Sequence, residues 1–209
     1  MLSSQRVRDL LLHSRGVAMT EFALTLPLFV FLIMGGLEVT NLALIHLRLN
    51  HVAESTADNA SRVRSQMDES DVEEIFTGAQ VEGQSINLEN KGRVILSSAQ
   101  DNNQPGNGRG QMIRWQRCFG GKKTPPAYGR EGKGQTDSSL KDGIGRPGRK
   151  IAAQPGTAVM FVEVAYDYDP MIFSGIINPR EIHYESAFNV RERTELGITN
   201  VRGKPVKSC

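Results

Sequence analysis

An unbroken apolar run near the N-terminus is the strongest hydrophobic pattern in the chain. From Val17 to Ile45 the sequence contains no basic side chain and two acidic ones, Glu21 and Glu38. A helix rises about 1.5 Å per residue, so a run of this length covers a hydrocarbon core of about 30 Å. We predict a transmembrane helix over 17–45. A cleaved secretory signal is the alternative, but its apolar region is shorter and ends in a small-residue site that is missing here.

The pattern after His46 is typical of an amphipathic helix. Apolar or small side chains recur at spacings of three and four, at Leu49, Val52, Thr56, Ala60, Val63 and Met67. We therefore predict that the membrane helix continues as one rod to about Met67, within an amphipathic segment 46–78. Ser70-Asp71-Val72-Glu73 predicts a capping box that opens a second helix, which Gly78 closes. The stripe is expected to pack on its own domain, with assembly contacts as a second use.

Beyond Gly83 the hydrophobic period falls to two, which is typical of half-buried strands. The expected strands cover 85–88, 93–98, 111–119, 157–168 and 181–191. Long connections without intervening helices favour antiparallel pairing. The predicted fold class is α+β: a long N-terminal helix, transmembrane and then amphipathic, followed by a small antiparallel β-sheet domain over 79–209.

Charge is nearly balanced overall but uneven along the chain. The 209 residues include 25 basic and 23 acidic side chains, so no nucleic-acid partner is expected. The loop 120–156 contains nine glycines, eight Lys or Arg and three acidic residues. A loop of this length is either functional or disordered, and its positive charge would attract anionic lipid or an acidic partner. We favour a solvated insertion, because only Tyr128 offers an aromatic face for base stacking.

The sequence contains no convincing catalytic or metal-binding pattern. Gly143 to Gly148 fits G-x-G-x-x-G, but no strand leads into it and Pro147 opposes a following helix. Glu163, Asp167 and Asp169 are expected to form an acidic patch, and calcium would need further ligands from elsewhere. No nucleophile has a recognisable base. We therefore expect a protein that is not an enzyme and has no cofactor and no metal site.

The two cysteines, Cys118 and Cys209, are expected to form an intrachain disulfide if the β-rich domain lies outside the cytoplasm. Closing a loop of about 90 residues would stabilise the fold by about 4 to 5 kcal/mol in the chain-entropy model. Two free thiols, or an intermolecular bond through the chain terminus, are the alternatives.

Charges before the apolar run predict its orientation. Arg6, Arg8 and Arg15 oppose a single Asp9, so the positive-inside rule places the N-terminus in the cytoplasm and residues beyond about 46 outside it.

Glu21 is the informative polar residue of the run, because an unpaired carboxylate in lipid costs a few kcal/mol. A cut after Gly16 would make Val17 the new N-terminus, with Glu21 fifth and Phe22 sixth. Glu21 then either is solvated at the headgroups or pairs with the new amine of a neighbouring subunit. Glu38 lies in the outer part of the span, where it can reach the interface or a polar partner.

The combination of a basic leader, Gly16, Glu21, Phe22 and a long apolar helix resembles the prepilin signals of type IV pilins and pseudopilins. The sequence from Arg15 to Leu28 is more narrowly similar to the TadE-like proteins of the tight-adherence (Flp) pilus system. Later segments resemble the same family, namely Arg114–Cys118, Phe161–Pro170 and the Val190–Arg193 run before Cys209.

This resemblance implies a membrane-anchored pseudopilin or minor pilin that acts in pilus assembly. A prepilin peptidase would remove the leader 1–16 between Gly16 and Val17. The mature protein would cross the bacterial inner membrane once, with its C-terminal domain in the periplasm. Implied partners are the major pilin, a sibling pseudopilin and platform proteins, together with the lipid bilayer. The alternative is an unprocessed single-pass protein whose periplasmic domain binds a ligand or an envelope component.

Overall fold

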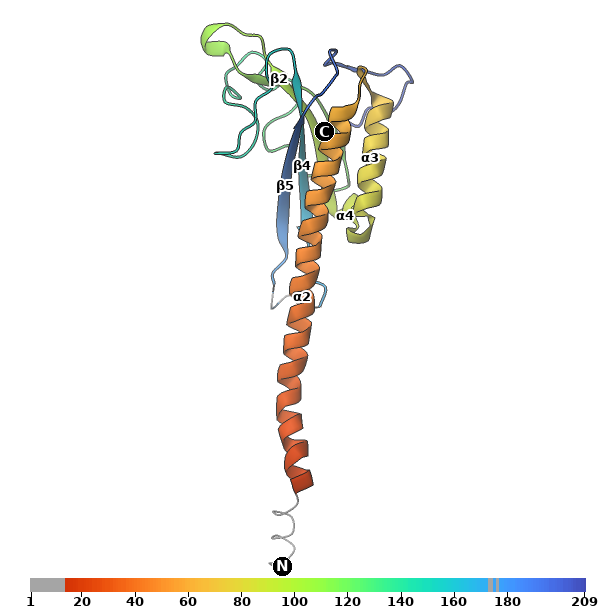
Figure 1. Cartoon of the computed structure of the whole chain (residues 1–209), viewed down its shortest axis with the longest axis vertical. Coiled ribbons are helices and arrows are strands. Elements are labelled where there is room, and N and C mark those ends of the chain that lie inside the picture. The colour runs from red at the N-terminus through yellow and green to blue at the C-terminus, as the bar shows by residue number, and fades with distance from the viewer. Residues whose placement is uncertain (1–13, 173–174, 176) are drawn as a thin grey trace, which may run out of the picture. The chain divides into compact units, whose positions relative to one another are not determined.

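The computed structural model describes residues 14–172, 175 and 177–209. The chain divides into two compact units, which we call the anchor unit (Met1–Ala43 with Pro170–Asn178) and the head unit (Leu44–Asp169 with Pro179–Cys209). Helix α2 (Ser14–Arg62) contributes residues to both (Figure 1).

The anchor part of α2 is apolar on all sides. Every large apolar side chain from Val17 to Met34 is exposed, with values that reach 79% for Leu24. Pro27 lies within the helix. This is the one helix among the described residues that is long and apolar enough to cross a membrane. The exposed apolar surface would be stable in lipid, where burial in protein is not needed.

The α2 helix ends at Arg62, so the expectation of one rod to Met67 is wrong. Met67–Asp68 instead forms a short strand, β1, which pairs in parallel with β6 (Ile198–Thr199). Helix α3 (Glu69–Gly83) follows, and its N-cap is Asp68 rather than Ser70. The Asp68 carboxylate accepts from the Ser70 N–H, and the Asp71 carboxylate accepts from the Asp68 N–H. The helix also runs past Gly78 to Gly83, so the expectation that Gly78 closes it is wrong.

The expected strand at 85–88 is wrong. A 3₁₀ turn, η1 (Gln84–Ile86), and a short helix, α4 (Leu88–Lys91), occupy this region. Asn87 between them has a left-handed φ of 53°. Leu88 packs tightly between Gly83 and Gly92, where an added Cβ would approach it to 2.4 Å in both cases. Four alternating residues were too few to distinguish a strand from this turn.

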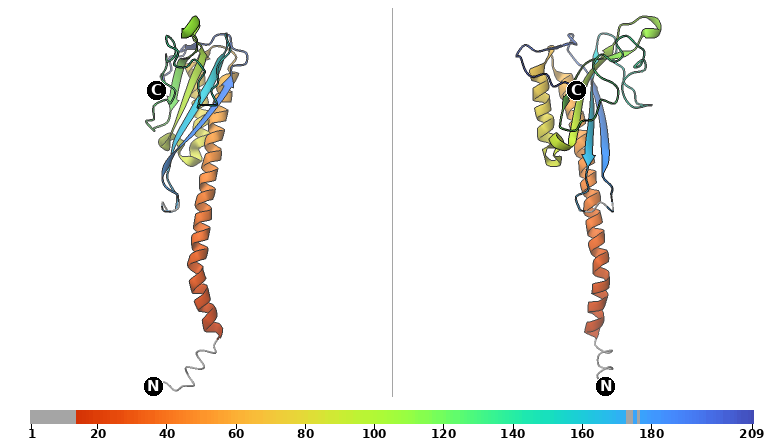
Figure 2. Two further views of the ribbon diagram at one scale, coloured as in Figure 1. Left: turned by 90° about the vertical axis from the view of Figure 1, so that its left-hand side faces the viewer. Right: turned by 180° about the vertical axis from the view of Figure 1, so that it is seen from behind.

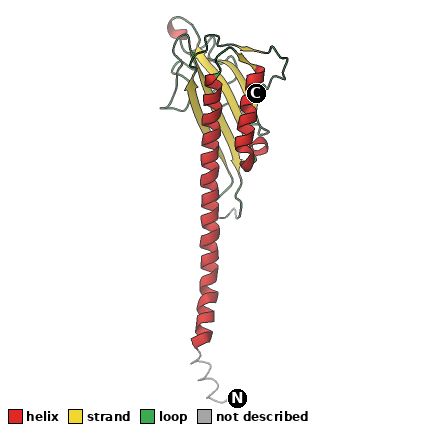
Figure 3. Ribbon diagram, turned by 45° about the vertical axis from the view of Figure 1, so that its right-hand side comes forward, coloured by secondary structure: helices red, strands yellow, loops and turns green. Residues whose placement is uncertain are grey.

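The head unit contains the predicted antiparallel sheet, which confirms the α+β fold class. Its strands are β2 (Gly92–Asp101), β3 (Gln111–Phe119), β4 (Ala158–Tyr168) and β5 (Arg180–Asn189), in the order β3-β2-β4-β5. A second 3₁₀ turn, η2 (Gly106–Gly108), lies in the β2–β3 connection. Helix α3 and the C-terminal part of α2 lie side by side on one face of this sheet (Figure 3).

Most residues of the loop 120–156 are exposed, as its composition suggested, but part of the loop also contributes to the core, which was not expected. It lies on the side of the sheet away from α3 (Figures 1 and 2). Its apolar side chains Leu140, Ile144 and Ala153 are buried in a cluster with Ala99, Ile113, Val159 and Phe161 of the strands. Because both faces of the sheet are covered, β4 is buried along nearly all its length.

Candidate functional site

The residues predicted for processing lie on the anchor part of α2. Gly16 and Val17 are both helical, and the side chains of Val17 and Phe22 are 53% and 59% exposed. Glu21 is also exposed, and its carbonyl accepts a hydrogen bond from Thr25 Oγ1 at 3.0 Å. These side chains are therefore accessible to a partner outside the chain. Residues 1–13 of the predicted leader lie outside the described residues.

Glu38 is the buried carboxylate of the anchor unit. Its side chain is 0% exposed, and its oxygens accept from the main-chain N–H of Met171 at 3.1 Å and of Ile172 at 2.9 Å. Sequence reasoning left its role open. The structure gives it a polar partner, which is the backbone of the connection between β4 and β5.

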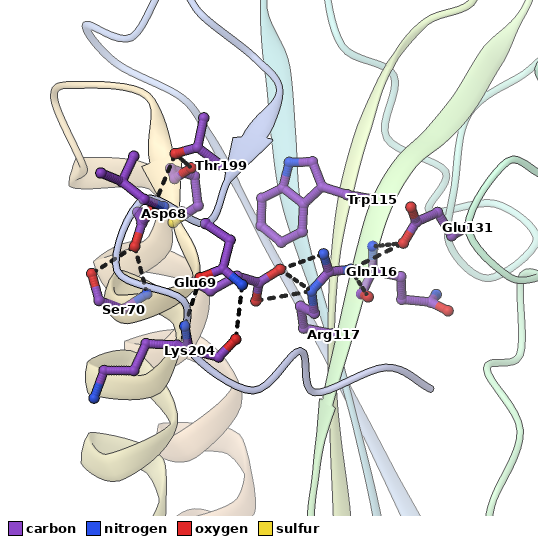
Figure 4. A network of polar contacts seen from close by, with 12 residues as sticks. Asp68, Glu69, Ser70, Trp115, Gln116, Arg117, Glu131, Thr199 and Lys204 are labelled. Carbon is purple, nitrogen blue, oxygen red and sulfur yellow. Dashed lines mark hydrogen bonds and ion pairs between the residues drawn. The ribbon is translucent and has the colours of Figure 1, made fainter.

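In the head unit, Arg117 is the centre of a buried ion-pair network that the sequence did not predict (Figure 4). Its Nε lies 2.8 Å from Glu69 Oε1, and its Nη1 lies 3.0 Å from Glu131 Oε2. The side chains of Arg117 and Glu69 are only 8% and 3% exposed, whereas Glu131 is 54% exposed. Arg117 therefore joins the start of α3 to β3 and to the loop 120–156.

Asp68 holds the ends of several segments together beside this network (Figure 4). Its carboxylate accepts from the N–H of Ser70 and of Val201, and from Thr199 Oγ1. The two backbone hydrogen bonds, that from Ser70 first, lower the pKa of Asp68 to about 2. The α3 cap and the C-terminal segment thus share one ionised acceptor.

A disulfide joins Cys118 of β3 to Cys209, with Cα atoms 5.1 Å apart. The Cys118 N–H also donates to the Lys207 carbonyl at 2.7 Å. The Lys207 ammonium lies over the rings of Phe76 and Phe119, about 6 Å from each centroid. The C-terminal segment is therefore held by covalent, hydrogen-bonding and cation–π contacts at the same edge strand.

The Trp115-Gln116-Arg117-Cys118 sequence has a structural use at every position. Trp115 is 1% exposed and donates from Nε1 to the Leu196 carbonyl at 3.3 Å. Gln116 donates to Ser97 Oγ at 2.9 Å. Together with the ion pair of Arg117 and the disulfide of Cys118, these contacts join β3 to β2, to α3 and to the C-terminal segment.

The expected acidic patch of Glu163, Asp167 and Asp169 does not form. Asp167 pairs with Lys122 at 2.5 Å and Asp169 pairs with Lys91 at 2.9 Å, while Glu163 is buried. The pattern along a strand contains only the strand's own residues, so it does not show basic side chains that come from the loop 120–156 and from α4. These basic side chains neutralise the acidic surface.

Glu163 belongs to a separate polar cluster under the loop. It accepts from the Ala127 N–H at 2.8 Å and lies opposite Glu185 in the pairing of β4 with β5. Burial, with the nearby Glu185 carboxylate, raises the pKa of Glu163 to about 7. Glu185 in turn accepts from Tyr128 Oη at 2.6 Å and from Arg146 Nε at 3.0 Å. Within this cluster, Glu163 is the group whose pKa is moved toward neutral pH.

A cavity of about 650 Å³ follows the edge strand β5 in the head unit. It is lined by residues 180–187, by His46 and Asn50 of α2, and by Arg146 and Arg149 of the loop. His46 Nδ1 lies 3.0 Å from Tyr184 Oη. Among the described residues, no group of three or more His, Cys, Asp or Glu side chains is arranged to hold a metal ion.

The described residues thus contain a helix capable of spanning a membrane and an α+β head unit closed by a disulfide. The family model described as TadE-like protein matches residues 16–58, which confirms the resemblance over the segment that contains Gly16, Glu21 and Glu38. A TadE-like match over an apolar N-terminal helix fits a Tad pilus-associated membrane protein. No curated protein and no solved structure gives a significant match to the chain.

Proposed function

We propose that this protein is a pseudopilin or minor pilin that acts, without catalysis, in the assembly of a Flp-type pilus. The observation that carries the proposal is the TadE-like match over residues 16–58, which starts at Gly16 and includes the exposed apolar part of α2. A plain membrane anchor needs apolar residues at these positions, but it does not need a glycine followed at the fifth position by a carboxylate.

In this proposal a prepilin peptidase cuts between Gly16 and Val17 on the cytoplasmic side of the inner membrane. The head unit then lies in the periplasm. The arginines before the apolar run support this orientation. The disulfide between Cys118 and Cys209 also supports it, because such bonds persist in oxidising compartments.

The exposed apolar helix provides the surface for partners within the membrane. After processing, the amine of Val17 in one subunit would pair with Glu21 of a neighbour and set the axial position of the packed helices. The major pilin, a sibling pseudopilin and platform proteins are the proposed neighbours. Gly36 faces open space, because nothing lies within 4 Å of a Cβ added there. Without side chains at 35 and 36, a helix of a neighbouring subunit would approach this part of α2 closely.

The decisive experiment is N-terminal sequencing of the membrane-extracted protein, made with and without its prepilin peptidase. The wild-type chain should begin at Val17 only when the peptidase is present. Gly16→Leu should retain the leader, because a branched side chain does not fit a cleavage site shaped for glycine. Gly36→Leu is the matched control on the same helix and should be cleaved normally. An intact Met1 in the wild-type protein with active peptidase would reject the proposal.

A second experiment tests the role of Glu21 in assembly. Glu21→Ala should be cleaved and retained in the membrane, yet should yield fewer pili, because only the contact between subunits is lost. Glu54→Ala, which removes an exposed carboxylate elsewhere on α2, should leave pilus number unchanged. Normal piliation by Glu21→Ala would show that the amine–carboxylate pair is not needed.

The cavity beside β5 favours one alternative function, an unprocessed anchor whose head unit binds an acidic ligand. Arg146, Arg149 and Arg180 line this cavity together with Glu181 and Glu185, so its charged side chains are three cations and two carboxylates. The two functions differ at the N-terminus, because the alternative keeps Met1 whether or not the peptidase is present.

A further inference from the structure

The connection between β4 and β5 has an unusual composition for a turn at the end of a hairpin. Between Asp169 and Arg180 the sequence contains no charged residue. The loop between β2 and β3, by contrast, is rich in Asn and Gly. The segment Pro170–Asn178 also belongs to the anchor unit, although both strands that it joins belong to the head unit. We call its first three residues, Pro170–Ile172, the tip.

The tip contacts the membrane helix through main-chain groups. The N–H groups of Met171 and Ile172 both donate to the Glu38 carboxylate, at 3.1 Å and 2.9 Å. Glu38 is 0% exposed, whereas Met171 is 63% exposed. The polar groups of this contact are therefore turned inward, and an apolar side chain is presented outward.

The depth of this contact follows from the position of Glu38 in the predicted span. Ile45, the expected outer end of the span, lies seven positions after Glu38, which corresponds to about 10 Å along a helix. At such a depth an unsatisfied carboxylate and unsatisfied backbone N–H groups are both strongly unfavourable, because lipid offers them no hydrogen-bond partner. Hydrogen bonding between them removes both costs. In water neither group would need the other.

We propose that the tip is a second membrane-contacting element, which lies in the outer leaflet beside α2 with Met171 against lipid. Glu38 is its positioning residue, because the carboxylate accepts the N–H groups that would otherwise face hydrocarbon. The ligand of this surface is the phospholipid bilayer. The inference rests on the proposed function only in that α2 must span the membrane.

The test places a fluorescent reporter at the tip of the full-length protein. Met171→Trp is reconstituted into phospholipid vesicles whose acyl chains are either unbrominated or brominated near the headgroup. The native Trp115 is buried in the head unit and provides a constant background. Bromine should abolish most of the emission added at position 171. Val201→Trp, at a head-unit position that is 85% exposed, should lose none.

Flotation of the same vesicles separates failure of this inference from failure of the anchor. If the protein floats with the vesicles but Met171→Trp is not quenched, the tip does not contact lipid and the inference is wrong. If the protein does not float, α2 is not a membrane anchor, and both the proposed function and this inference are overturned.

Variants of Glu38 in the Met171→Trp background test the positioning role. Glu38→Leu removes the acceptor and should abolish the quenching while flotation persists. Glu38→Gln keeps an oxygen acceptor and should retain the quenching. Glu54→Leu, at an exposed position further along α2, is the matched control and should behave as the parent. Full quenching in Glu38→Leu would show that Glu38 does not hold the tip.

Discussion

The two parts of helix α2 differ in what covers their apolar side chains. In the anchor part, every large apolar side chain from Val17 to Met34 is exposed. In the head part, Leu49, Val52, Ala53, Ala57 and Ala60 are completely buried. The backbone conformation is the same throughout, so the difference lies in the size and spacing of the side chains.

Large residues surround the anchor part on all sides, which suits a uniform apolar solvent. The head part has a single stripe with alanines at 53, 57 and 60, and these small side chains let the helix backbone approach its neighbours closely. Apolar content alone therefore predicts that a helix avoids water. The spacing of large and small side chains around the helix predicts whether lipid or protein covers its apolar surface. Changes that unfold one unit while leaving the other intact would test this separation.

The largest expected effect comes from opening the disulfide of the head unit. Cys118→Ser should lower the free energy of unfolding by about 4 to 5 kcal/mol, because the unfolded chain gains the freedom of a long loop. Urea unfolding of the full-length protein in detergent, followed by Trp115 fluorescence, measures the loss. Membrane flotation should be unchanged, since the anchor part contains no cysteine.

The control for this prediction is the double variant of Cys118 and Cys209. Each single serine variant removes the same bond, so the double variant should be no less stable than either single one. Both thiols found free in protein trapped from intact cells would reject the bridge and weaken the periplasmic assignment. A covalent dimer through Cys209 would change the connectivity alone.

The next largest effect is expected at Arg117. Arg117→Ala leaves the Glu69 carboxylate buried without its cation, which costs about 3 to 5 kcal/mol. Glu131→Ala removes the exposed partner of the same arginine and should cost less than about 1 kcal/mol. The same urea titration compares the two. Equal losses of unfolding free energy would show that the buried Glu69–Arg117 pair does not stabilise the head unit more than the exposed pair with Glu131.

Two leucines within one turn of α2 allow buried and exposed apolar side chains to be compared directly. Leu49 is 0% exposed and Leu47 is 67% exposed, and both belong to the head unit. Leu49→Ala should reduce the stability of the head unit by about 2 to 5 kcal/mol through a cavity. Leu47→Ala should change it by less than about 0.5 kcal/mol. A comparable loss from Leu47→Ala would mean that this face of the helix packs against protein.

Hydrophobic period was enough to predict the apolar helix and four of the five expected strands, because both depend on residues close together in sequence. The antiparallel pairing followed from long connections without intervening helices. The ion pair of Glu69 and Arg117 joins residues 48 positions apart, and nothing in the local pattern of either connects them. The backbone partners of Glu38 are 133 and 134 positions away and carry no side-chain signal.

The loop 120–156 was misjudged for a related reason. Its glycines and lysines dominate the composition, whereas the side chains that it adds to the core cluster, Leu140, Ile144 and Ala153, follow no regular period. Segments that cover a sheet without forming a helix or strand are invisible to periodicity. The offset of the α3 cap is a smaller error, because Asp68 and Ser70 are both good capping residues and the short strand β1 selects between them.

The smallest expected effect is a pH dependence that belongs to the head unit alone. The pKa of Glu163 is raised from 4.5 to about 7 by burial and by Glu185. Between these values the folded state binds more protons than the unfolded state, so stability falls as the pH rises. The contribution is complete below pH 4.5 and is lost as the pH passes 7. A shift of this size corresponds to at most about 3 kcal/mol.

Glu163→Gln should remove this dependence, because the amide oxygen still accepts from the Ala127 N–H but no longer titrates. Its unfolding free energy should exceed that of the wild type above pH 7, and the difference should shrink toward pH 4.5. Asp142→Asn, which removes a carboxylate outside the cluster, should retain the wild-type slope. Urea titrations across this range measure all three proteins. Parallel curves for Glu163→Gln and the wild type would mean that Glu163 is charged in the folded head unit, so that water or Arg146 reaches it despite its burial.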